Sequence, residues 1–436
     1  MNKQILRLAL PNILSNLSVP LLGMVDTALM GRMDAEEYLG AIALGGIIFS
    51  FVYWGFGFLR MGTTGLTANS LGTGDKQQVQ YTLWRGLGVA AAGSVLVIGL
   101  QFPIEWISFW LIEGEPQVES LAADYFYIRI WAAPATIGLY VFHGWFLGMQ
   151  NARFPMWLTI VVNVLNIVFN LMFVLGLGMK VEGVAWGTLI AQYGGLIMAI
   201  GLMKARYAHY LQTPRWAELW QGEALKRFFS VNLDIFIRTL CLIFTFAYFT
   251  AKASELGTLL LAANHVLLQY LMLMAYGVDG FAFAAESLVG KYKGQADREA
   301  LREVISRLFK WGIGIGIAFS LLYALAGTPL LGLFTDQEEV ISTASLYINW
   351  MILIPITAAV AFMWDGVYIG ATATRPMRNT MVLATFGGFL PACEMGLMYV
   401  GNHGLWLAMA IFMVVRSISL SVLAKRWIFP LEKIKT

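Results

Sequence analysis

The sequence predicts an all-α integral membrane protein whose twelve transmembrane helices form two six-helix lobes, related by a pseudo-two-fold axis along the membrane normal. Three observations support this prediction. Of the 436 residues, 58% are hydrophobic and only 13% are charged, whereas about a quarter of the residues of a soluble protein are charged. Twelve apolar stretches are long enough to cross a bilayer. The second half of the chain repeats features of the first half at a nearly constant offset.

The twelve stretches are recognised by length, because a helix rises about 1.5 Å per residue and must cross about 30 Å of hydrocarbon. In chain order they cover residues 5–31, 38–60, 82–103, 120–148, 155–177, 184–203, 228–250, 258–285, 308–328, 343–370, 379–400 and 403–424. The first is too long for a cleavable signal peptide and contains Pro11, Pro20 and Asp26, so we expect it to remain as a helix.

Basic residues are distributed unevenly over the connections between these spans. The side that holds both termini carries 22 of the 29 Lys and Arg residues, and the opposite side carries three. Because cytoplasmic loops are enriched in Lys and Arg, we expect both termini in the cytoplasm. The other four cations lie within spans or at their rims: Arg60, Arg129, Arg238 and Arg416.

An internal repeat divides the chain in two. Pro134 and Pro155 are 21 residues apart, as are Pro355 and Pro376, and each interval encloses a GxxxG motif. The motif glycines are Gly144 and Gly148 in the first copy and Gly366 and Gly370 in the second. GxxxG alone also marks close helix packing in unrelated membrane proteins. The matching offsets are what packing does not explain, and they indicate parallel repeats of six spans each.

The repeat extends to the polar loops and sets the expected domain boundaries. Asp75 recurs as Asp297, and Arg85 recurs as Arg307 at the same offset. The most polar long connection follows the sixth span and reads as a linker with an interfacial helix. We therefore expect an N-terminal lobe over 1–203, a cytoplasmic linker over 204–227 and a C-terminal lobe over 228–436.

Asp26 is the most informative charge in the first lobe, because a carboxylate inside a span is costly. Burial raises the pKa of a carboxyl, so such a group can hold a proton in one conformation and release it in another. Pro11 and Pro20 each remove a helical hydrogen bond and allow the same helix to bend. The alternative is an Asp that is bonded to a neighbour and does not titrate.

Amides form a second polar feature of the first lobe. Asn163, Asn166 and Asn170 are three and four residues apart, so they share one face of the fifth span. We expect that face to point into the lobe, either lining a polar cavity or packing helices together. His143 is a further candidate, either for proton transfer or as a hydrogen-bonded packing residue.

The second lobe carries more intramembrane charges, which must find partners. The candidate network consists of Asp234, Arg238, Asp279, Glu286, Asp365 and Arg416. One interpretation is a structural ion-pair network near the cytoplasmic end of the lobe. The other is a second cation site with carboxylate ligands.

Other functional classes are disfavoured. The chain has no phosphate-binding GxxxxGK[ST] loop and no catalytic HExxH or GxSxG motif, so neither ATP-driven transport nor enzymatic activity is expected. A net charge of +3 is too small to indicate a nucleic-acid partner. We expect no soluble cofactor and no metal.

Several segments resemble a known family along the whole chain. They are RLALPNILSNLSVPLLGMVDTALMGRM, FLRMGTTGLTA, VDGFAFAAES, DGVYIGAT and GNHGLWLA. They resemble the multidrug and toxic compound extrusion (MATE) family, in its DinF-like branch. This resemblance implies alternating-access export of bulky, often cationic and aromatic drugs across a bacterial inner membrane, in exchange for H+ or Na+. The expected partners are small toxic compounds and the lipid bilayer, and the chain is expected to act as a monomer.

The resemblance also implies roles for individual residues. Asp26 matches the acid of the first helix that is expected to take up the proton, and bending near the prolines is the implied switch. Asn166 matches the asparagine of an LNIVLD pattern, but this chain reads LNIVFN and so carries Asn170 where relatives often carry Asp. His143 stands where some relatives carry Asn, which fits a hydrogen-bonding role.

The main alternative is a flippase of lipid-linked headgroups, as in distant relatives. Anionic headgroups would require cations in the cavity, whereas the four arginines named above face six interior acids: Asp26, Asp234, Asp279, Glu286, Asp365 and Glu394. Aromatic residues such as Phe51, Tyr53, Trp54, Tyr140 and Trp145 are candidates for cavity walls that suit flat cations.

Overall fold

The computed structural model describes residues 1–30, 36–112, 114–211, 215–220 and 222–429, without the side chains at 19–22, 24–30, 36 and 216. The side chains of Pro20 and Asp26 therefore lie outside the described residues. Every regular element in the described ranges is helical, which confirms the all-α prediction.

The chain divides into two compact units. We call Leu14–Phe229 the N-terminal unit, and Met1–Ile13 together with Ser230–Thr436 the C-terminal unit. Two helices contribute to both: α1 (Asn2–Met30) and α11 (Gly222–Glu255). The beginning of α1 thus packs with the second half of the chain, and the beginning of α11 packs with the first half.

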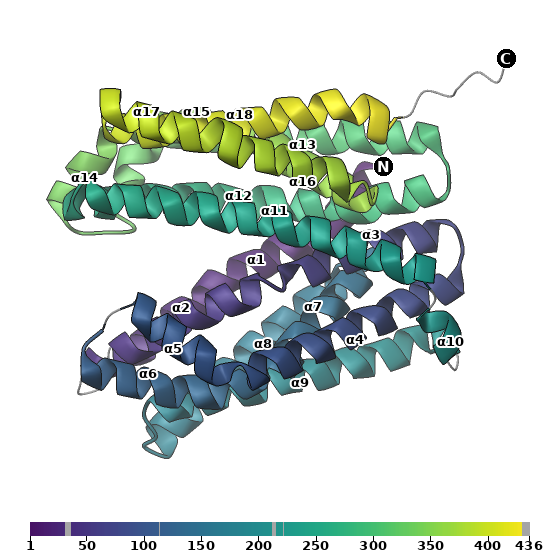
Figure 1. Ribbon diagram of the computed structural model, residues 1–436, viewed down its shortest axis with the longest axis horizontal. Helices are drawn as coiled ribbons and strands as arrows, with labels where there is room; N and C mark the ends of the chain where they lie inside the picture. Colours follow the sequence, from purple (N-terminus) through teal and green to yellow (C-terminus); the bar gives the residue numbers. More distant parts are fainter. Residues whose placement is uncertain (31–35, 113, 212–214, 221, 430–436) are drawn as a thin grey trace. The chain divides into compact units, whose positions relative to one another are not determined.

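The remaining helices of the N-terminal unit follow the predicted spans (Figure 1). They are α2 (Glu36–Trp54), α3 (Gly57–Gly72), α4 (Lys76–Gly99), α5 (Gln101–Leu111), α6 (Pro116–Arg129), α7 (Ala133–Gly148), α8 (Arg153–Leu171), α9 (Val181–Tyr207) and α10 (Trp216–Leu219). Short 3-10 turns follow α6 and α9, and a π-helix, Met172–Gly176, follows α8.

The C-terminal unit contains the corresponding helices of the second repeat (Figure 1). Besides α11 they are α12 (Thr258–Gly294), α13 (Arg298–Leu331), α14 (Glu338–Ser345), α15 (Ile348–Gly370), α16 (Thr374–Val382), α17 (Leu390–Val400) and α18 (Asn402–Trp427). A π-helix, Leu383–Phe389, joins α16 to α17.

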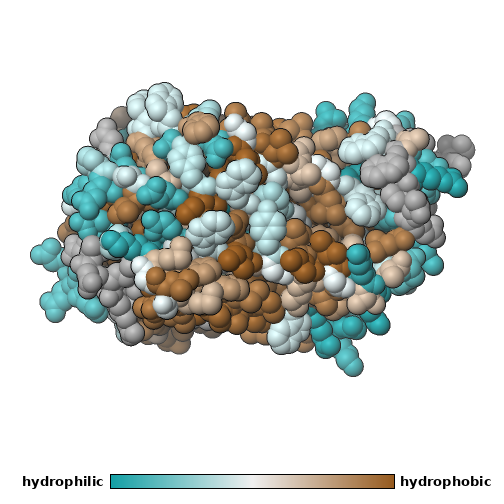
Figure 2. Space-filling view, turned by 90° about the horizontal axis from the view of Figure 1, so that it is seen from below, coloured by the Kyte–Doolittle hydropathy of each residue, from teal (hydrophilic) through white to brown (hydrophobic). Residues whose placement is uncertain are grey.

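The helices are suited to a bilayer. Within the described residues, eleven helical segments are long and apolar enough to cross a membrane, and α1 adds a helix of 29 residues. Hydrophobic side chains cover much of the visible helix surface, and hydrophilic side chains gather toward the helix ends (Figure 2). An exposed apolar surface of this extent requires lipid around it.

Several predicted span ends differ from the ends of the helices, and the second span is one example. The second span was expected to end at residue 60, but after a break at Gly55 and Phe56 the helix continues as α3 to Gly72. The residues beyond the predicted end include Thr63, Thr64 and Thr67, and all three are fully buried. These small hydroxyl residues pack inside the unit instead of facing solvent, which hydropathy alone does not reveal.

The internal repeat is visible in backbone detail. The Asp75 side chain accepts a hydrogen bond from the Gln78 N–H at 2.9 Å and caps α4, and Asp297 caps α13 by accepting from Ala300 at the same distance. Gly74 and Ala296, each one residue before its cap, both have positive φ. The two aspartates at matching positions of the repeat therefore begin equivalent helices.

The GxxxG motifs make equivalent contacts in the two units. A Cβ at Gly144 would collide with the Arg60 carbonyl of α3, and a Cβ at Gly148 would lie 2.9 Å from the Thr64 carbonyl. In the C-terminal unit, a Cβ at Gly366 would collide with the Ala282 carbonyl of α12, while one at Gly370 would lie 2.9 Å from the Ala285 carbonyl. Glycine is needed here because the two backbones approach each other directly.

Candidate functional site

The amide face of α8 points into the N-terminal unit. Asn166 and Asn170 are 3% and 1% exposed. The Asn170 amide donates to Asn166 Oδ1 at 2.9 Å, and the Asn166 amide donates to Thr188 Oγ1 of α9 at 2.9 Å. Gly187 of α9 leaves room for this arrangement, because a Cβ there would collide with Asn170 Oδ1. The three polar groups form one buried hydrogen-bonded chain between two helices.

The same face reaches α1. The Asn163 amide donates to both the carbonyl and the hydroxyl of Ser18, at 3.3 and 3.2 Å. One turn earlier on each helix, Ser15 Oγ donates to Thr159 Oγ1 at 3.0 Å. Because the later contact on α1 pairs with the later residue on α8, the two helices run in the same direction. We call Thr159, Asn163, Asn166 and Asn170 the polar seam of α8. Its first two residues contact α1, and the seam runs in the direction in which α1 continues.

The other residues predicted for the first lobe lie apart from this seam. His143 of α7 precedes the packing glycine Gly144, and among the described residues no hydrogen-bond partner reaches its buried Nε2 atom. Pro11 is partly buried within the continuous helix α1. These two residues therefore lie outside the hydrogen-bonded chain of the amides.

Aromatic residues of the N-terminal unit divide into core and surface. Trp145, a candidate for a cavity wall, is fully buried, and its indole N–H donates to the Val79 carbonyl at 3.0 Å. Phe51 and Trp54 are exposed on α2. Arg129 lies over the ring of Phe49 with its guanidinium carbon 4.8 Å from the ring centre, a contact that sequence reasoning missed. Of these candidates, Trp145 serves in packing.

In the C-terminal unit, Asp365 of α15 joins two arginines. It accepts hydrogen bonds from Arg416 Nη2 of α18, at 2.6 Å, and from Arg238 Nη2 of α11. Arg416 is fully buried. Asp279 of α12 lies close enough to Arg416 for their charges to interact. Two cations and two acids on four helices therefore balance each other's charge inside the unit.

Asp234 belongs to a different ion pair. Although Arg238 lies one turn away on α11, the Asp234 carboxylate accepts from Arg378 Nη1 at 2.7 Å and from Thr374 Oγ1 at 2.8 Å, both of α16. Glu286 is buried on α12, where Gly370 packs on its backbone. Asp234 is therefore joined to Arg378, a residue with no signal in the sequence beyond its position at a basic helix start.

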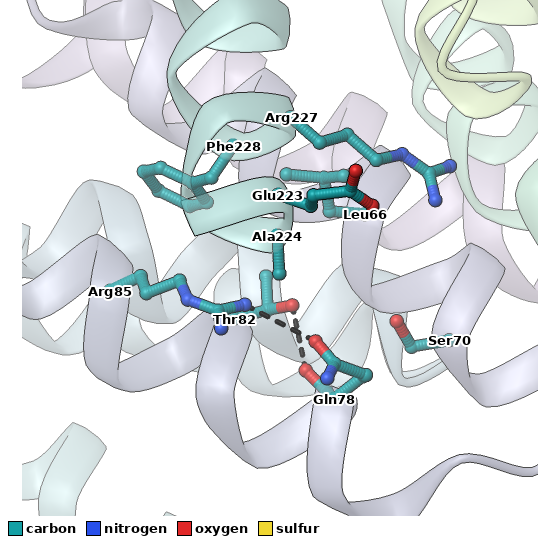
Figure 3. A pocket seen from close by; sticks show the side chains of 9 residues that line it. All are labelled: Leu66, Ser70, Gln78, Thr82, Arg85, Glu223, Ala224, Arg227 and Phe228. Atoms are coloured by element: carbon teal, nitrogen blue, oxygen red, sulfur yellow. Dashed lines mark hydrogen bonds between the residues drawn. The ribbon is translucent and has the colours of Figure 1, made fainter. Parts of the chain in front are cut away.

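The linker before α11 is fixed to α4. The Glu218 carboxylate accepts from Arg215 at 3.0 Å and from the Tyr81 hydroxyl at 3.1 Å, and Arg85 Nε donates to the Leu219 carbonyl at 2.8 Å. The bond from Arg215 is the main cause that lowers the pKa of the Glu218 carboxyl. Beside these contacts, a cavity of about 330 Å³ lies between α3, α4 and the start of α11 (Figure 3).

Comparison with known proteins agrees with this architecture. The MatE family model matches residues 11–172 and 235–392. DNA damage-inducible protein F of Escherichia coli is 36% identical over 431 residues, covering 98% of this chain and 92% of that protein. A probable multidrug resistance protein NorM of Thermotoga maritima is 24% identical, covering 95% of this chain and 90% of that protein.

Solved structures share the fold. An outward-facing multidrug resistance MATE family transporter of the MOP superfamily superposes with a TM-score of 0.85 at 19% identity, covering 97% of this chain and 96% of the other. The Vibrio cholerae MATE transporter VcmN in its bent form gives 0.86 at 18% identity, covering 98% and 97%. The twelve-helix, two-lobe fold predicted from the sequence is that of these transporters.

The family match spans both repeats, and the relative at 36% identity spans nearly the whole chain. These proteins are transporters and not enzymes, as the missing catalytic motifs predict. The chain therefore belongs to the MATE family of multidrug efflux transporters.

Proposed function

We propose that this protein is a secondary active antiporter that exports bulky, often cationic and aromatic compounds in exchange for H+ or Na+ by alternating access. The observation that carries this proposal is the family membership, joined to polar contacts between α1 and α8 in the N-terminal unit, the same α1 whose sequence contains Asp26. No ATP-binding motif is present to supply energy in another way.

Asp26 is the proposed coupling group, and helix geometry supports this role. Ser15 of α1 contacts Thr159 of α8. Eleven residues, or about three turns, separate Ser15 from Asp26 and also separate Thr159 from Asn170. Because α1 and α8 run in the same direction, we infer that positions 26 and 170 lie at the same height along the two helices. A carboxyl beside a buried amide can exchange a proton while its neighbour stays neutral.

Asn170 makes Asp26 the only acid expected at this level. The resemblance implies that an Asp at the position of Asn170 would give two carboxyls to share the proton. An amide has no proton to exchange at ordinary pH, so here the coupling must fall on Asp26 alone or on acids of the C-terminal unit. The bonded state of Asp365 and Asp234 favours a structural role for those acids.

Alternating access would use both repeats as lobes. We propose functional lobes over 1–203 and 228–436, joined by the linker 204–227, with α1 bending at Pro11 and Pro20 when the charge on Asp26 changes. We further propose that the protein resides as a monomer in a bacterial inner membrane with both termini in the cytoplasm. The uneven distribution of Lys and Arg supports that orientation.

Efflux from proteoliposomes tests the proposal. A fluorescent organic cation is loaded, and its movement is followed under an imposed pH gradient and under a Na+ gradient. Antiport predicts efflux that depends on one of these gradients and stops when the gradient is dissipated. Efflux that ignores both gradients would contradict antiport, and movement of labelled lipid-linked headgroups in the same vesicles would favour a flippase.

A further inference from the structure

The C-terminal unit has an open groove of about 700 Å³ between α13, α15 and α18. Its lining is mostly apolar and includes Phe309, Ile313 and Ile317 of α13 and Trp364 of α15. The Trp364 indole donates to Ser421 Oγ of α18 at 2.7 Å, and the Trp364 ring packs on Phe309 with ring centres 4.7 Å apart. These contacts join the three helices along the groove and give it a defined wall.

Lys310 gives this apolar groove a positive charge. It lines the groove and also a smaller cavity that contains Arg307 and Trp311. Lys310 is exposed, and the apolar part of α13 begins next to it. Lysine and tryptophan side chains are typical of the level of lipid headgroups. The groove therefore continues from the headgroup level into the hydrocarbon region along Ile313 and Ile317.

The equivalent face of the N-terminal unit is covered by protein. The aspartate caps align α4 with α13, so that Arg85 corresponds to Arg307 and Gly88 to Lys310. Arg85 binds the linker through the Leu219 carbonyl, and a Cβ at Gly88 would lie 3.3 Å from the ring of Trp220. A lysine there would have to displace the Trp220 ring.

The C-terminal copy has instead an exposed lysine. Arg307 pairs with Glu303 of its own helix at 2.9 Å. The face that the linker covers in one repeat is thus open and basic in the other repeat. At this depth of a membrane, the available molecules with an apolar chain and a negative head are anionic phospholipids.

We propose that the groove is a binding site for an anionic phospholipid of the phosphatidylglycerol class. The phosphate lies at Lys310, and one acyl chain follows Ile313, Ile317 and Trp364. The site does not depend on the proposed antiport. We place it in the cytoplasmic leaflet, and this placement rests on the proposed orientation. Charge selects the headgroup and the groove holds the chain, so each can be tested separately.

Native mass spectrometry of the full-length protein tests the headgroup. The protein is released from micelles that contain equal amounts of phosphatidylglycerol and phosphatidylcholine, and the lipids bound to each molecule are counted. The parent should retain phosphatidylglycerol in preference. Lys310→Glu should reduce that preference about thirtyfold, because the substitution changes the local charge by two units and each unit near the surface contributes about 1 kcal/mol. Arg302→Glu is the matched control, since it is exposed on the same helix and lines neither cavity.

Filling the groove tests the acyl chain. A Cβ at Gly314 meets open space, so Gly314→Phe fills the groove without a collision with the backbone. This variant should lose bound phosphatidylglycerol, whereas Gly201→Phe, at another open glycine, should keep it. Glycerol phosphate, which has the headgroup without chains, should not be retained. A thermal unfolding measurement on each variant separates loss of binding from loss of the fold.

Several results would overturn the proposal. They are equal retention of the two lipids by the parent, equal losses in Lys310→Glu and Arg302→Glu, and unchanged lipid binding by a folded Gly314→Phe. A dimer that replaces the lipid-bound monomer and that Gly314→Phe abolishes would also overturn it, because the groove would then bind a second copy of the chain.

Discussion

Asp365 is the residue on which the buried charges of the C-terminal unit depend. It accepts hydrogen bonds from Arg238 and Arg416, and both arginines are buried. Asp365→Asn removes the carboxylate that balances two buried guanidinium groups, in surroundings of low dielectric constant. Breaking a buried ion pair by removing one partner costs about 3–5 kcal/mol. We expect a loss of this size in the free energy of unfolding, measured by denaturant titration in detergent.

The control for Asp365→Asn is Glu303→Gln, which removes an exposed ion pair with Arg307. Exposed pairs contribute about 0–1 kcal/mol. If the two variants unfold at the same denaturant concentration, the arginines of the C-terminal unit do not need Asp365, and the charge balance described for this cluster is wrong.

For single residues, the sequence predicts which polar side chains point inward better than it predicts the partners that they bind. The three-and-four spacing of Asn163, Asn166 and Asn170 predicted one inward face, and the structure buries Asn166 and Asn170. Partners from distant parts of the chain could not be read. Asp234 binds Arg378, 144 positions away, because α11 and α16 are brought together only by the tertiary fold.

The motif helices provide a prediction at the scale of the element. Gly366→Ala should destabilise the protein, because its Cβ would collide with the Ala282 carbonyl of α12 and force the two backbones apart. Overpacking of this kind costs about 1–3 kcal/mol. The matched variant is Gly46→Ala in α2, whose Cβ meets open space. It should be neutral or stabilising by up to about 1 kcal/mol, since alanine favours a helix.

Thermal unfolding of the two variants in the same detergent compares them directly. Equal melting temperatures would contradict the close approach of α12 and α15. The same measurement on Gly144→Ala tests the first repeat, because the two motifs make equivalent contacts with α3 and α12.

The docked linker gives a pH-dependent prediction. The pKa of the Glu218 carboxyl is lowered in the folded protein, chiefly by the hydrogen bond from Arg215. A lowered pKa contributes stability above the ordinary value for glutamate, and that contribution is lost as pH falls through the folded pKa. A nitroxide label at Ala217 should therefore become more mobile on acidification, as electron paramagnetic resonance can measure. In Glu218→Gln the label should already be mobile at neutral pH. If neither acidification nor Glu218→Gln changes the mobility of the label, the Glu218 contacts do not hold the linker on α4.

Helix identity was predictable and helix ends were not. Apolar length is enough to find the spans, because lipid demands it. The end of α3 was missed since its buried threonines look like a solvent-exposed turn in the sequence. The division of α1 between two units could not be foreseen either, because it depends on which helices its first residues touch.

Orientation is a property of the whole molecule, and it can be tested with cysteines. Cys241 and Cys393 are buried and can be replaced by serine to give a background without thiols. If both termini are cytoplasmic, a membrane-impermeant maleimide should label Glu338→Cys in intact cells. It should label Ala217→Cys only after the membrane is opened. The reverse pattern would invert the orientation inferred from Lys and Arg.

Most of the architecture followed from composition and repetition. Hydropathy predicts the twelve spans, and the constant offset between matching residues of the two halves predicts the duplication. The covering of one repeat by the linker and the open basic groove of the other have no such signal. The offset pairs Gly88 of α4 with Lys310 of α13, but only the structure shows that Trp220 packs against Gly88 and that Lys310 lines an open groove.

We propose that Asp26 alone couples ion movement to export, and a measurement of proton-driven efflux by Asp26→Asn tests this role. Parent, Asp26→Asn and Glu303→Gln proteins are reconstituted equally, and efflux of a fluorescent cation is measured under an imposed pH gradient. Substrate binding is measured in parallel to show that each variant is folded. We expect Asp26→Asn to bind the cation but to lose gradient-driven efflux, while Glu303→Gln behaves like the parent. Undiminished gradient-driven efflux by Asp26→Asn would show that Asp26 is not the coupling group and would assign the coupling to acids of the C-terminal unit.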